Sequence, residues 1–197
     1  MEEIIENLKL TDIIKSAIVF LERNDYESLH LIENNTLEQA IINFNKDYSE
    51  ICVMIYGLRK IISKKHISQT NSWADYKKSI VENLNSALNV YREEDPSKFN
   101  NYIKNIIEII KKADHELGRY VSVVIDDGRV KLASTAYAYG LSASQSSDLL
   151  SITKEQLMSY VGITKMPDED NQFKSINERV HLLEIMSEKD KGDTQWK

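Results

Sequence analysis

Hydroxyl, amide and ammonium side chains are concentrated in two short stretches between residues 140 and 162. Such groups donate hydrogen bonds to phosphate oxygens and contact the edges of nucleic-acid bases: Gln can pair bidentately with adenine, Lys can reach guanine or phosphate, and Ser can contact either. In chain order, these side chains are Ser142, Ser144, Gln145, Thr153, Lys154, Gln156 and Ser159. Their chemistry predicts a surface that contacts DNA, with Ser142, Ser144 and Gln145 positioning the DNA backbone and the later residues facing bases or phosphate.

The residues between these side chains predict two short helices joined by a tight turn. Ser146 and Ser147 are small, as a close helix crossing requires, and apolar residues follow where the two helices would share a core. Thr153 can cap the second helix. Ser151 occupies the turn position where glycine often permits a left-handed backbone, which costs a serine about 1 kcal/mol.

The stretch GLSASQSSDLLSITKEQLMSYVG, residues 140–162, resembles the short helix-turn-helix of small antitoxin-like DNA-binding proteins of archaea and bacteria. It is also similar to the carboxy-terminal part of uncharacterised archaeal helical proteins. In those families the crossing pair is typically Ala-Ala and the turn residue is Gly, so Ser146, Ser147 and Ser151 depart from the pattern together. The resemblance implies non-enzymatic DNA binding in regulation or toxin neutralisation.

The elements that would position this module are helical. The chain has 197 residues, 42% of them apolar, with only six Gly and two Pro, which favours long helices and few turns. We therefore predict an all-α protein: an antiparallel helical bundle over 1–126, a compact helix-turn-helix over 128–165, and a C-terminal helix with a polar tail over 167–197. Expected helix starts include Thr11 or Asp12 and the Asp95-Pro96 pair, where aspartate caps and proline opens a helix.

Residues 120–134, YVSVVIDDGRVKLAS, fit two structures. β-Branched residues around Asp127-Gly128 are also typical of a hairpin, which would place a small wing beside the module. We expect helix on both sides of a break near Gly128, because an isolated hairpin would lack partner strands.

The charge pattern gives the DNA hypothesis mixed support. The net charge is −6, which weighs against general coating of nucleic acid. Residues 128–166 carry four cations and two anions, so this segment is basic by about +2 between acidic neighbours.

Two alternative functions remain open. A scaffold of paired helices that binds a protein partner suits the acidic balance better. An HEPN-like ribonuclease or RNA-binding relative is suggested by Arg59 with His66, and equally by Arg23 with His30, which fit the spacing of that family's cation–histidine pair. We expect no catalytic residue, metal or cofactor, since the single Cys52 lies in an apolar run and no metal-ligand spacing occurs.

A late apolar stripe suggests a second chain as a further partner. Helix-turn-helix proteins usually present two modules to DNA, so a homodimer is expected. The stripe residues are Phe173, Ile176, Val180 and Leu183. The acidic amino terminus and the lack of a long apolar run predict a cytoplasmic protein without a membrane span.

Overall fold

The computed structural model describes residues 9–92, 95–118 and 124–163, and these ranges contain α-helices and no strand. The all-α prediction is confirmed for this part of the chain. The helices are α1 (Leu10–Arg23), α2 (Tyr26–Asn43), α3 (Lys46–Ser63), α4 (Lys65–Ser68), α5 (Asn71–Arg92), α6 (Pro96–Gly118), α7 (Val124–Ala138), α8 (Ala143–Leu150) and α9 (Lys154–Ile163).

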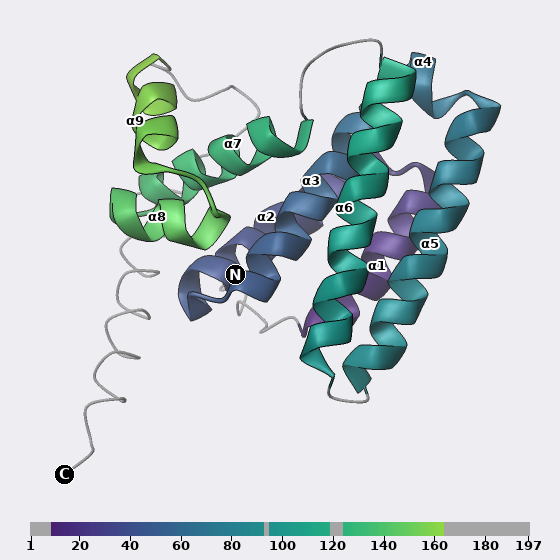
Figure 1. Cartoon of the computed structure of the whole chain (residues 1–197), viewed down its shortest axis with the longest axis horizontal. Coiled ribbons are helices and arrows are strands. Elements are labelled where there is room, and N and C mark those ends of the chain that lie inside the picture. Colours follow the sequence, from purple (N-terminus) through teal and green to yellow (C-terminus); the bar gives the residue numbers. More distant parts are fainter. Residues whose placement is uncertain (1–8, 93–94, 119–123, 164–197) are drawn as a thin grey trace, which may run out of the picture.

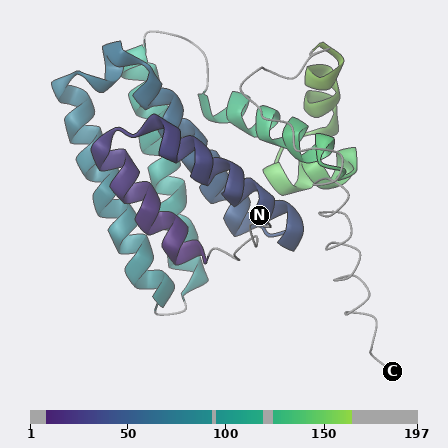
Figure 2. The same ribbon diagram turned by 180° about the vertical axis from the view of Figure 1, so that it is seen from behind.

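Helix α3 lies at the centre of the molecule. It contacts α2, α6, α7 and α8, while α5 and α6 pair along their length and α1 packs on α2 and α5 (Figure 1). Every residue from Ile51 to Arg59 is buried, as expected for a helix that is apolar on several sides. The short helices α7, α8 and α9 gather on the side of α3 away from α5 (Figures 1 and 2).

A buried ion pair joins α2 to α3. The Arg59 guanidinium donates to both carboxylate oxygens of Glu33, at 2.7 and 3.0 Å, and to the Tyr26 hydroxyl at 2.7 Å. Both charged side chains are nearly inaccessible to solvent. Because a buried charge is costly unless it is paired and hydrogen-bonded, this geometry fixes the register of the two helices.

Side-chain caps mark several helix starts, and one differs from the prediction. Asp25 accepts a hydrogen bond from the Ser28 N–H at 3.0 Å, and Asp95, just before Pro96, accepts one from the Lys98 N–H at 3.1 Å. Helix α1 begins at Leu10, two or three residues earlier than expected, so neither Thr11 nor Asp12 caps it. Leu10 is buried with the core, and this packing replaces a polar cap.

The predicted break near Gly128 is wrong, because α7 continues through that residue to Ala138. Gly128 is buried against the ring of Tyr56 in α3: a Cβ added there would lie 2.5 Å from Cδ1 of that ring. The glycine therefore allows two helices to approach closely and does not interrupt the backbone. The described part of 120–134 contains no hairpin, and α7 runs across the proposed boundary at 126–128.

Replacing Gly128 tests this close approach. We expect Gly128→Ala to lower the free energy of unfolding by about 1–3 kcal/mol, because the tyrosine ring or the helix must shift. Gly162→Ala is the matched control, since a Cβ at Gly162 meets nothing within 4 Å. Urea denaturation should show no loss of stability for the control; an equal loss in both variants would contradict the packing role.

Candidate nucleic-acid interface

Helices α8 and α9 are joined by the three-residue turn 151–153 and pack on α7. Ser151 adopts the left-handed conformation with a φ of 56°, and the Ile152 N–H donates to the Ser147 carbonyl at 3.0 Å. Leu149, Leu150 and Leu157 are fully buried. The serine therefore makes the turn that glycine makes in similar motifs.

Both helices begin with a reciprocal cap. The Gln145 N–H donates to the Ser142 hydroxyl at 3.2 Å, and the Gln145 side-chain oxygen accepts from the Ser142 N–H at 2.9 Å. Thr153 and Gln156 repeat the arrangement at 3.1 and 2.9 Å. The two glutamines are thus structural residues, and their carboxamide oxygens are already engaged.

The predicted contact residues do not all lie in one place. Ser142 and Gln145 are exposed at the start of α8, Ser144 is half-buried, and Thr153 and Gln156 are exposed at the start of α9. A separate row of exposed residues runs along α9 at helical spacing, and we refer to it as the outward face of α9. It consists of Lys154, Glu155, Met158, Ser159 and Gly162. Met158 is 47% exposed, and it was not among the contact residues predicted from the sequence, which were all polar.

The carboxy-terminal end of α8 is held by side chains of the bundle. The Ser49 hydroxyl of α3 lies 2.7 Å from the Leu149 carbonyl oxygen and 2.8 Å from that of Lys46. Arg129 of α7 donates to the Leu150 carbonyl at 3.1 Å and to both carboxylate oxygens of Glu50, at 2.7 and 2.6 Å. We refer to these contacts as the α8 anchor.

The α8 anchor changes the electrostatics expected from the sequence. Arg129 is neutralised by Glu50, so it adds little to the basic character of this region. Lys154 is the sole cation within 143–163, where Asp148 and Glu155 are acidic. Hydrogen bonds from its own backbone N–H and from the Thr153 side chain lower the pKa of Glu155 below its usual value.

The HEPN-like alternative rests on two residue pairs, Arg23 with His30 and Arg59 with His66. Arg23 ends α1, and His30 lies in α2 with its ring 6.3 Å from that of Tyr26. Arg59 is buried in the Glu33 ion pair, whereas His66 is exposed on α4. Burial raises the pKa of the Cys52 thiol and keeps it from acting as a ready nucleophile. In the described ranges, no three His, Cys, Asp or Glu side chains are placed to hold a metal ion.

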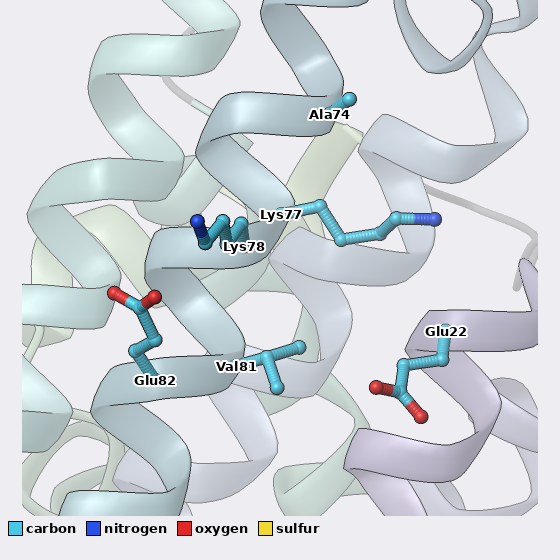
Figure 3. A pocket seen from close by; sticks show the side chains of 6 residues that line it. All are labelled: Glu22, Ala74, Lys77, Lys78, Val81 and Glu82. Carbon is cyan, nitrogen blue, oxygen red and sulfur yellow. The ribbon is translucent and has the colours of Figure 1, made fainter.

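A shallow hollow of about 250 Å³ lies between α1 and α5 (Figure 3). Its wall residues are Glu22, Ala74, Lys77, Lys78, Val81 and Glu82. Acidic and basic groups balance in it, and Lys77 lies 3.4 Å from the Asn24 side-chain oxygen. No convergent set of polar groups defines a ligand there.

Comparison with known proteins finds no matching family model, no similar curated protein and no similar solved structure. Among the helices described, none is long and apolar enough to cross a lipid bilayer. The predicted dimer stripe at Phe173, Ile176, Val180 and Leu183 lies outside the described residues, as does the expected C-terminal helix.

Removing the hydroxyl groups of two serines at this site should change the free energy of unfolding in opposite directions. Ser147 is buried and its hydroxyl has no hydrogen-bond partner among the described residues, whereas Ser49 holds the Leu149 carbonyl. We expect Ser147→Ala to raise the free energy of unfolding by about 1 kcal/mol and Ser49→Ala to lower it by about 1–3 kcal/mol. Chemical denaturation would measure both, and changes of the same sign would contradict the assignment.

The Arg129–Glu50 pair can be measured by a double-mutant cycle with Arg129→Ala and Glu50→Ala. We expect a coupling energy of about 1.5–3 kcal/mol, because the contact is bidentate and largely shielded from solvent. Lys111–Glu108 is a suitable reference pair on the surface of α6, where the coupling should stay below about 0.5 kcal/mol. Equal coupling in the two pairs would show that Arg129 does not hold α8.

Proposed function

We propose that the protein binds double-stranded DNA non-enzymatically, with the outward face of α9 in the major groove. The observation that carries the proposal is that this face is solvent-exposed while Leu157, on the opposite side of α9, is fully buried. A major groove about 12 Å wide accommodates a helix of this kind. The exposed serine and capping groups at the start of α8 would contact the phosphate backbone of the same duplex.

The α8 anchor supports the proposal because it fixes the orientation of α8 relative to α3 and α7. Contacts to base edges require side chains that are held in place before binding. The left-handed backbone at Ser151 ends the helical hydrogen bonding of α8 before the Leu149 and Leu150 carbonyls. These carbonyls accept instead from Ser49 of α3 and Arg129 of α7. A duplex would therefore meet a pre-formed surface.

Charge sets the expected strength of binding. With Lys154 as the sole cation of α8 and α9, each bound copy neutralises few phosphates. The logarithm of the binding constant should then fall with the logarithm of salt concentration by only about 1 for each copy bound. Useful affinity would need base contacts and two copies on one duplex, which agrees with the proposed homodimer.

A protein-binding scaffold is the second candidate. It is favoured by the scarcity of cations on the outward face of α9 together with the exposed Met158. A partner in that case would be a protein with an apolar contact surface, and DNA would not compete for it.

Reversing one charge tests the DNA proposal. Duplexes are first selected from random sequence with the full chain at low salt, and binding is then followed by fluorescence anisotropy. We expect Lys154→Glu to weaken binding at least about tenfold, because it removes one contact to the duplex and repels phosphate. Lys78→Glu on α5 makes the same change in net charge far from α9 and should bind like the wild type.

Failure to select any duplex would refute DNA binding. Equal weakening by the two variants would mean that overall charge, and not the outward face of α9, determines binding. The melting temperatures of both variants should match that of the wild type, since both lysines are exposed.

A further inference from the structure

Some hydrogen-bonding groups of α9 are engaged within the protein, and others are exposed to solvent. The Gln156 carboxamide oxygen accepts from the Thr153 N–H at 2.9 Å, which leaves its NH₂ group as a donor. The Glu155 carboxylate is exposed beside it and is the remaining strong acceptor at the start of α9. The Gln156 oxygen is therefore occupied within the protein, whereas the Glu155 carboxylate is open to solvent.

On the same face, two exposed donors lie beside an apolar group. The Lys154 ammonium is exposed, and the Ser159 hydroxyl is exposed one turn further along the helix. Met158, between them on the same face, is 47% exposed and carries a flexible thioether. A complementary surface must offer acceptors and an apolar group at the same place.

In the major groove, thymine meets that description. It presents the O4 acceptor beside its C5-methyl group, and guanine adds acceptors at N7 and O6. Cytosine has no methyl group for Met158 to contact, and bidentate pairing of Gln156 with adenine would require the cap of α9 to open. Resting on the proposed function, we infer that Met158 recognises the C5-methyl group of thymine within a site rich in thymine and guanine on the contacted strand.

The test uses duplexes selected with the full chain, in which each thymine is replaced in turn by uracil. Uracil removes the methyl group and keeps the base pair. At one or two positions, uracil should weaken binding of the wild type by about fourfold, the value expected for one apolar carbon withdrawn from contact. Met158→Ala should bind the thymine and uracil duplexes equally, and Met158→Leu, which keeps an apolar contact, should remain sensitive to uracil.

The outcomes separate this inference from the function on which it rests. Selected duplexes without a shared thymine would overturn the inference and leave DNA binding intact. The same would follow from uracil sensitivity that persists in Met158→Ala. If no duplex is selected at all, the proposed function fails and the inference fails with it.

Discussion

The orientation of α8 and α9 depends on how the end of α8 is hydrogen-bonded. The left-handed turn at Ser151 ends the backbone hydrogen bonding of α8. It leaves the carbonyls of the buried residues Leu149 and Leu150 without a donor from the helix. An unpaired carbonyl there would be costly, and Ser49 and Arg129 supply the missing donors. Glu50 in turn neutralises Arg129, so that a network from α3 and α7 ends at the turn before α9.

The same network explains why the surface proposed as an interface carries little net positive charge. Arg129, one of the four cations that the sequence places in residues 128–166, is engaged in the α8 anchor. Lys154 and Glu155 are then the charged groups of the outward face of α9, beside Met158 and Ser159. Recognition by such a surface depends on hydrogen-bond donors, shape and an apolar contact more than on general attraction to phosphate. The buried Arg59–Glu33 pair holds α3 in the central bundle, and α3 carries the Ser49 and Glu50 side chains of the α8 anchor.

Local chemistry in the sequence predicted much of this fold. Asp95 caps the helix that begins at Pro96, Ser146 and Ser147 are buried where α8 crosses its neighbours, and the helices are the only regular elements of the described residues. Long-range contacts were not predictable in the same way. Gly128 was misjudged because its partner, Tyr56, belongs to another helix, and Arg129 reaches Glu50 and Ser49 reaches Leu149 across 79 and 100 residues. Met158 was not among the predicted contact residues because these were chosen for their hydroxyl, amide and ammonium groups.

The most direct test of the account is a titration of the full chain with a selected duplex, followed by the backbone amide signals in NMR spectra. Binding through the outward face of α9 predicts that the largest shifts fall within residues 153–162, with smaller ones near Ser142, while α1, α5 and α6 remain unchanged. Shifts centred on the bundle helices, with α9 unaffected, would contradict the assignment of this face as the DNA-binding surface.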